Sequence, residues 1–87
     1  MRDQKKAAAL SYNKIEDCAP KLIAKGVGET ADEIVQLAKE HQIPIQENVT
    51  LVEMLSQLEI NETIPEQLYE VVAEIFAFIY KVDQQSR

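Results

Sequence analysis

The stretch PKLIAKGVG, residues 20–28, decides the fold, because it marks the passage from a strand into a helix. Pro20 opens this segment, two lysines bracket its apolar centre, and Gly26-Val27-Gly28 closes it with a turn, a pattern typical of a strand. Residues 29–41 then place apolar side chains at near-helical spacing, with polar side chains between them. That spacing predicts an amphipathic helix directly after the strand.

The segments on either side extend this pattern. Residues 7–12, AAALSY, are short and apolar, and composition alone does not choose between a buried strand and a single helical turn. Residues 43–47, IPIQE, follow the helix, and Pro44 both prevents its continuation and favours extended backbone, which predicts a short third strand. Residues 50–58 and 65–82 each carry apolar side chains on one face, so both are predicted helices.

The order of these elements predicts an α/β fold, with a small mixed sheet of about three strands covered by three helices. A helical crossover between the second and third strands favours a parallel pair with a right-handed connection. The first two strands are joined by seven residues and can be antiparallel neighbours. A chain of 87 residues has room for one hydrophobic core, so we expect a single domain over residues 1–87 with an ordered core at about 7–82.

Three threonines are each followed, three residues later, by a glutamate at a predicted helix start. The pairs are Thr30 with Glu33, Thr50 with Glu53, and Thr63 with Glu66. A threonine hydroxyl can accept the amide at the third helical position while the glutamate reaches back to the threonine amide. The pairs therefore predict three capping boxes, each contributing about 1 kcal/mol to stability.

Composition limits the class of protein. Cys18 is the only cysteine, which excludes an intrachain disulfide and fits a reducing, cytoplasmic setting. The most apolar stretch, residues 68–82, is interrupted by charges and is shorter than the roughly 20 residues that cross a bilayer, so no membrane span is predicted.

Charge is shared unevenly along the chain. Residues 1–26 carry six basic and three acidic side chains, whereas residues 27–87 carry three basic and twelve acidic ones, and the two parts should attract. Nucleic-acid affinity depends mainly on clustered Lys and Arg that neutralise phosphates, and a chain with a net charge of −6 is poorly suited to it. The basic segment is interpreted as a solvated surface balanced by the acidic helices rather than as a dedicated partner patch.

Few side chains suggest chemistry. His41 stands at a predicted helix end with no second histidine or cysteine near it in sequence, so it is interpreted as a helix-end residue and no metal or cofactor is predicted. Cys18 lies beside Asp17, whose charge disfavours a thiolate, and is expected to be inert. For Tyr69 and Tyr80 on the last helix, packing in the core and display on the surface both remain open.

Four segments are distinctive in combination: ALSY at 9–12, APKLIAKGVG at 19–28, IPI at 43–45 with Glu47, and IPEQLYEVVAEIFAFIY at 64–80. In this order they resemble the cytoplasmic C-terminal domain of the FlhB family, whose members belong to flagellar and virulence type III secretion systems. The resemblance covers residues 7–82. It departs from the family at Ile60-Asn61, where relatives usually have a glycine as the second residue. Asparagine tolerates a left-handed backbone better than other non-glycine residues, so the family turn is expected to be kept there.

FlhB-family members are membrane proteins whose cytoplasmic domain cleaves itself between Asn and Pro of an Asn-Pro-Thr-His motif, and the cleavage switches the class of exported substrate. The asparagine side chain is the nucleophile of that reaction. Here the register places Arg2-Asp3-Gln4-Lys5 at the motif, and the three prolines follow Ala19, Ile43 and Ile64, so the sequence contains no Asn-Pro bond. The chain thus resembles the downstream cleavage fragment, and the resemblance implies no autocatalysis.

A non-catalytic protein-binding module that contacts export components or substrates is therefore the predicted function, and a soluble regulator or chaperone-like protein unrelated to export is the alternative. In relatives, the strand before the cleavage point pairs with the strand that follows it. Residues 7–12 are therefore expected to form a bare sheet edge, where a partner segment or a second copy of the chain adds a strand. The loop preceding Pro20 is a second expected contact. The predicted contact residues are Lys5, Lys6, Ala7, Ala9, Ser11, Lys21, Lys25, Tyr69 and Tyr80.

Overall fold

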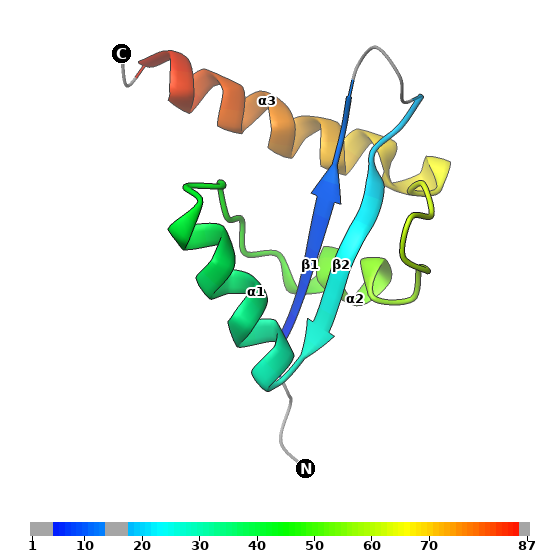
Figure 1. Cartoon of the computed structure of the whole chain (residues 1–87). Helices are drawn as coiled ribbons and strands as arrows, with labels where there is room; N and C mark the ends of the chain where they lie inside the picture. The colour runs from blue at the N-terminus through cyan, green and yellow to red at the C-terminus, as the bar shows by residue number, and fades with distance from the viewer. Residues whose placement is uncertain (1–4, 14–17, 86–87) are drawn as a thin grey trace.

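The computed structural model describes residues 5–13 and 18–85, and for residues 80–85 it describes only the backbone. Two strands come first, followed by the helices (Figure 1). In chain order the elements are β1 (Lys6–Ser11), β2 (Lys21–Val27), α1 (Glu29–Glu40), α2 (Val49–Leu55), the short 3-10 helix η1 (Glu66–Leu68) and α3 (Tyr69–Gln85).

The two strands pair antiparallel, as the sequence allowed, and residues 7–12 are largely strand rather than helical turn. Ala7 pairs with Gly26 and Leu10 with Leu22, but the register shifts between Ala9 and Leu10, so Ile23 is an extra residue on β2. This bulge places Leu22 and Lys25, three residues apart, on the same face of the sheet, although strict alternation would separate them.

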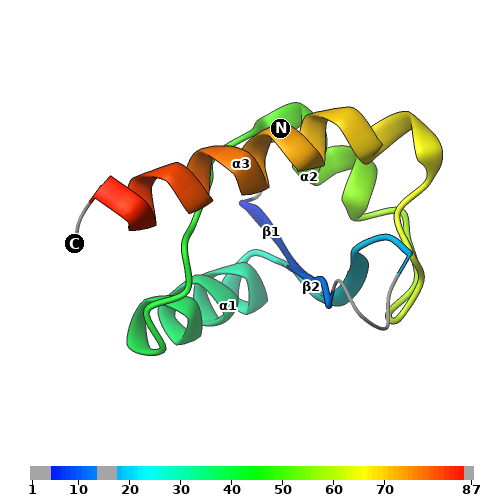
Figure 2. The same cartoon turned by 90° about the horizontal axis from the view of Figure 1, so that it is seen from above.

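The sheet lies between α1 on one face and α2 with α3 on the other (Figure 2). Ala8 and Leu10 face the α2 and α3 side, so the alternate residues Ala7 and Ala9 face α1. Small side chains let the helix approach closely. At Gly26 the start of α1 lies so near that a Cβ there would stand 2.9 Å from the Cβ of Thr30.

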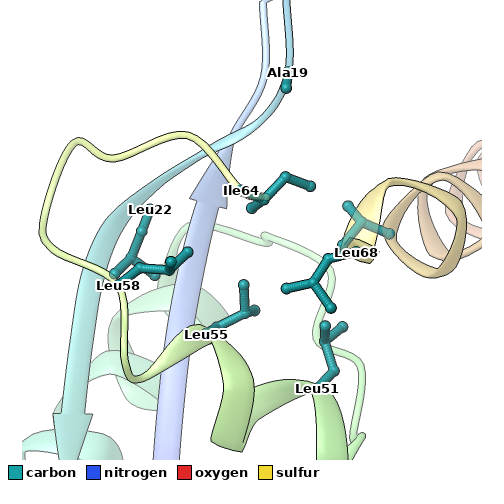
Figure 3. Close-up of a cluster of buried hydrophobic side chains, with 8 residues drawn as sticks. Ala19, Leu22, Leu51, Leu55, Leu58, Ile64 and Leu68 are labelled. Carbon is teal, nitrogen blue, oxygen red and sulfur yellow. The ribbon is translucent and has the colours of Figure 1, made fainter. Parts of the chain in front are cut away.

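The hydrophobic core lies on the other face of the sheet (Figure 3). Leucines of α2 meet residues of β2, of the loop after α2 and of the start of α3. Its buried members are Ala19, Leu22, Leu51, Leu55, Leu58, Ile64, Leu68 and Val72. Burying each of the larger side chains contributes about 1.5–3 kcal/mol, so this cluster fixes α2 and α3 against the sheet.

Residues 61–64 cover the edge of β2 near its start. The amide of Leu22 donates to the carbonyl oxygen of Glu62 at 2.9 Å, and the amide of Asn61 donates to the carbonyl oxygen of Leu22 at 2.6 Å. Asn61 itself has a φ of 75°, which confirms the expected left-handed turn at this position. This edge of the sheet is therefore partly closed by the chain itself.

The predicted α/β class and three helices are confirmed, but the predicted third strand is wrong. Residues 43–48 have no regular secondary structure, so the expected parallel pair with β2 does not form. Pro44 lacks an amide donor, and within the described part of the chain no backbone hydrogen bond joins this segment to β1. Extended backbone becomes a strand only when a neighbouring strand lies within hydrogen-bonding reach.

All three predicted capping boxes are also wrong, because each helix starts elsewhere. Gly28, with a φ of 65°, is the residue before α1, so Thr30 already lies inside that helix. Asn48, and not Thr50, caps α2, because the side-chain oxygen of Asn48 accepts a hydrogen bond from the amide of Leu51 at 3.0 Å. Thr63 instead forms a bridge with β2, and Pro65 precedes η1.

Candidate functional site

An open apolar groove of about 200 Å³ lies where the two strands meet the first turns of α3. The ring of Tyr12 stacks on that of Phe76, with centroids 6.1 Å apart and an interplanar angle of 23°. All of the residues that line the groove are uncharged: Tyr12, Cys18, Ala19, Pro20, Tyr69, Val72, Ala73 and Phe76.

The floor and the walls of this groove differ in exposure. Ala19 and Val72 are buried members of the core, so they form the buried floor of the groove. Tyr12 and Tyr69 are 40% and 44% exposed, so their rings stand in the walls with one side in water. Aromatic rings held in this way offer a large contact area at low entropic cost, and their hydroxyls can still reach water or a polar partner.

The backbone of β1 presents a second feature. The amide of Gly28 donates to the carbonyl oxygen of Lys5 at 2.7 Å, so these two residues form a hydrogen-bonded pair. Because such pairs alternate along an antiparallel ladder, Ala7 and Ala9 also bond inward to β2. Lys6, Ala8 and Leu10 then point their amides and carbonyls away from β2. We call these outward backbone groups the open edge, because they have no partner among the described residues.

Three of the predicted contact lysines are engaged within the molecule. Lys5 pairs with Asp32 at 3.0 Å and Lys6 with Glu53 at 2.9 Å. Both pairs join the basic start of the chain to the acidic helices, which confirms the expected attraction. Lys25 donates to the carbonyl oxygens of Ser56 and Leu58 at 3.2 and 2.6 Å, just after the end of α2.

The other predicted contacts are scattered. Lys21 begins β2 and bridges to Thr63, and Ser11 ends β1. Tyr69 lines the groove, whereas the side chain of Tyr80 lies outside the described residues. Of the predicted contacts, Tyr69 and the loop before Pro20 therefore meet in the groove, whereas none of the predicted contact lysines lines it.

The remaining candidates are placed as follows. His41 is the residue that ends α1, and the exposed Cys18 lines the groove. In the described ranges no group of three His, Cys, Asp or Glu side chains is placed to hold a metal ion. Over the same residues, no helix is long and apolar enough to span a bilayer.

The sequence did not single out the pairing of Tyr12 with Phe76. Tyr12 follows the first strand and Phe76 belongs to the last helix, so 64 positions separate them and only the fold brings the rings together. The one signal in the sequence was an aromatic residue, Tyr12, just past the end of a strand. Such a residue occurs on many protein surfaces, so it does not by itself indicate a groove.

Comparison with known proteins identifies relatives of this chain. Residues 4–79 match the family described as FlhB HrpN YscU SpaS. The uncharacterized protein YlqH of Bacillus subtilis (strain 168) is 52% identical over 80 residues, which cover 92% of this chain and 86% of YlqH. The flagellar biosynthetic protein FlhB of the same organism is 41% identical over 80 residues, but this chain spans only 22% of its length.

Solved structures agree with the sequence comparison. The cytoplasmic domain of FlhB from Shewanella putrefaciens superposes with a TM-score of 0.87 at 30% identity, covering 93% of this chain and 64% of that structure. The H265A variant of the EscU C-terminal domain superposes with a TM-score of 0.81 at 26% identity, covering 86% of this chain and 92% of that one. By sequence and by fold, the chain belongs to the FlhB HrpN YscU SpaS family.

Proposed function

We propose that this chain is a non-catalytic, cytoplasmic protein-binding module that contacts components or substrates of a flagellar or type III export apparatus. The observation that carries the proposal is the apolar groove beside Pro20, with its buried floor and half-exposed aromatic walls. Membership of the FlhB HrpN YscU SpaS family, and relatives named as flagellar biosynthetic proteins, supply the export setting.

The dimensions of the groove favour a peptide over a metabolite. Pockets for drug-sized ligands typically occupy about 300–1,000 Å³ and enclose most of the ligand. This groove is smaller, at about 200 Å³, and open, so it suits one or two apolar side chains of a protein segment. A partner anchored by an aliphatic or aromatic residue would cover the exposed faces of Tyr12 and Tyr69.

The sequence supports a role without self-cleavage. Self-cleavage of the family type requires an asparagine directly before a proline, and the prolines of this chain follow Ala19, Ile43 and Ile64. No bond in these 87 residues therefore offers the reacting pair.

The open edge of β1 is the second contact that we propose. Its outward amides and carbonyls can pair with a strand from a partner or with a second copy of the chain. Hydrogen exchange tests this contact at the amides of Ala8 and Leu10, because those of Ala7 and Ala9 are already bonded to β2. Amides at Ala8 and Leu10 that stay unprotected in the presence of a bound partner would refute it.

The groove is tested with a pair of matched variants. Ala73 is exposed on α3 and lines the groove, whereas Ala77 is exposed one turn later and does not. We expect Ala73→Glu to weaken binding to purified flagellar export components or substrates of B. subtilis at least tenfold, because the carboxylate would be desolvated by an apolar anchor. Ala77→Glu adds the same charge to the same helix and should leave affinity unchanged.

The native cysteine provides an independent readout. Cys18 is exposed, lines the groove and is the only thiol in the chain, so its reaction rate with a thiol reagent should fall when the groove is occupied. Binding only to proteins outside the export apparatus would favour the alternative function as a regulator or chaperone. If Ala73→Glu and Ala77→Glu bind the partner with equal affinity, the groove is not the contact surface.

A further inference from the structure

Residues 56–64, which we call the strap, lead from the end of α2 to Pro65 along the side of β2 that faces away from β1 (Figures 1 and 2). Among the described residues, three backbone hydrogen bonds join the strap to the start of β2 and to Pro20. Leu22 takes part in two of them, and in the third the amide of Ile64 donates to the carbonyl oxygen of Pro20 at 2.9 Å. The C-terminal part of the strap is therefore fixed to the sheet.

The strap connects the two sides of the apolar groove. Pro20 lines the groove from the sheet, whereas Tyr69 lines it from the first turn of α3. Ile64 bonds to Pro20 and lies five residues before Tyr69, with Pro65 and the short helix η1 between them. The side chain of Ile64 is 2% exposed and belongs to the core cluster that also contains Val72 of α3. The placement of Ile64 thus determines how α3 stands relative to Pro20.

Lys25 holds the other end of the strap. Its ammonium group donates to the carbonyl oxygens of Ser56 and Leu58, at 3.2 and 2.6 Å. In the part of the chain that the structure describes, no carboxylate forms an ion pair with Lys25, so its charge is directed to these carbonyls. Hydrogen bonds from a charged donor are about twice as strong as those between neutral groups. Lys25 is therefore a firm anchor, although it lines no part of the groove.

The turn between the two anchors is braced by its own hydrogen bonds. The amide of Glu59 donates to Oε1 of Glu62 at 2.8 Å, and the amide of Glu62 donates to the carbonyl oxygen of Glu59 at 3.0 Å. Asn61 follows the left-handed path that this turn requires. Few backbone angles are then free to change between Leu58 and Ile64. A displacement at the Lys25 end should accordingly reach Ile64.

We infer that Lys25 is the positioning residue of the groove: it fixes the strap, and the strap sets the spacing between Pro20 and α3. This inference rests on the proposed function of the groove and names the residue that controls its shape from outside. Loss of the Lys25 charge would leave two carbonyls at the end of α2 without their donor. The strap would then be held at one end only, and fewer molecules would carry the groove in its binding shape.

The free chain provides the first test, with its alanine methyl groups labelled with ¹³C. Ala19 and Ala73 line the groove from the sheet and from α3, so their methyl signals report its shape. Lys25→Met should shift both signals and weaken the nuclear Overhauser contacts between the rings of Tyr12 and Phe76. Lys25→Arg keeps a charged donor and should leave the signals and the ring contacts as they are.

The control for a general loss of stability is Ala31→Gly. Ala31 is fully buried on α1, on the other face of the sheet, so this change weakens the fold without touching the strap. The Ala19 and Ala73 signals should then stay in place. Amide exchange at Ile64 is compared with that at Val72 in the same variant, because both rise together when the whole chain unfolds. In Lys25→Met, exchange at Ile64 should rise at least about tenfold more than at Val72.

Binding measurements connect the strap with the groove. With the same purified flagellar export components and substrates of B. subtilis, Lys25→Met should bind at least about threefold more weakly, because affinity falls with the fraction of binding-competent molecules. Lys25→Arg should bind as the unchanged chain does. In the unchanged chain, a bound partner should slow amide exchange at Ile64.

The other outcomes separate this inference from the proposed function. If Lys25→Met and Ala31→Gly shift the methyl signals alike, or exchange at Ile64 rises only as much as at Val72, Lys25 acts on stability alone and the inference is overturned. Full affinity of Lys25→Met beside weak binding of Ala73→Glu would also overturn it, but would leave the groove as the contact surface. Should Lys25→Met fail to fold, an Ile64 amide that a bound partner leaves unprotected in the unchanged chain would overturn the inference.

Discussion

Replacing Ala8 with proline and, separately, Ala9 with proline tests which way the backbone of β1 faces. The two residues are adjacent alanines in one strand, so both changes impose the same ring and the same restriction on φ. They differ in the direction of the amide that proline removes. The ladder turns the amide of Ala9 inward to Ala24 and that of Ala8 outward to the open edge.

The difference in stability between the variants can be worked from this geometry. Ala9→Pro removes a ladder hydrogen bond and leaves the carbonyl of Ala24 without its donor, which costs about 1–3 kcal/mol beyond the effects that the two variants share. Ala8→Pro removes no bond that the structure shows, and proline is tolerated on edge strands. We therefore expect Ala9→Pro to be the less stable variant by about 1–3 kcal/mol.

Urea unfolding followed by circular dichroism measures this difference directly, with equal slopes for both variants as the check that the transition stays two-state. For a chain of this size the difference corresponds to a shift of several degrees in Tm. Equal stabilities, or a larger loss for Ala8→Pro, would show that the register is shifted by one residue. The open edge, and with it the strand contact, would then be placed on the wrong backbone groups.

Two further predictions concern stability. Gln42 adopts a φ of 59° after α1, where its amide and that of Ile43 bond to Lys39 and Ala38, so Gln42→Gly should relieve left-handed strain and stabilise the fold by about 0.5–1 kcal/mol in thermal unfolding. The control is Gln42→Val, which should destabilise, and a Gln42→Gly variant that melts earlier would contradict the assigned backbone. Lys25→Met should cost about 1–2 kcal/mol, because the ammonium group binds two carbonyls at the end of α2. Lys5→Met breaks only an exposed ion pair and should cost less than about 0.5 kcal/mol, so equal losses from both lysine variants would refute the distinction.

Local patterns predicted most of the secondary structure because they act within a few residues. Near-helical spacing located α1 to within one residue. The turn predicted over Gly26-Val27-Gly28 is shorter than expected, because β2 continues to Val27 and Gly28 alone separates it from α1. The left-handed turn at Asn61 was likewise a local preference. Such features depend on backbone sterics and on the alternation of apolar side chains, and both can be read from sequence.

The errors arose where a distant partner decides the outcome. Whether residues 43–48 form a strand depends on a neighbour, and β1 does not bond to them. Two of the Thr-Glu pairs do not form capping boxes because their residues make other contacts. Glu53 pairs with Lys6, and Thr63 bridges to β2. A capping signal of about 1 kcal/mol does not fix a helix start against such tertiary contacts.

The groove is built so that its walls can change without loss of the fold. Its floor, Ala19 and Val72, belongs to the core cluster, so truncating Val72 would create a cavity and unfold part of the population. Its walls are not core: Tyr69 is 44% exposed and Ala73 is exposed, so substitutions there remove little buried area. Stability and the proposed recognition thus depend on different residues of the same two turns of α3. Partner specificity can accordingly be altered at the walls at small cost to stability, and a loss of binding in a wall variant reports on contact rather than on unfolding.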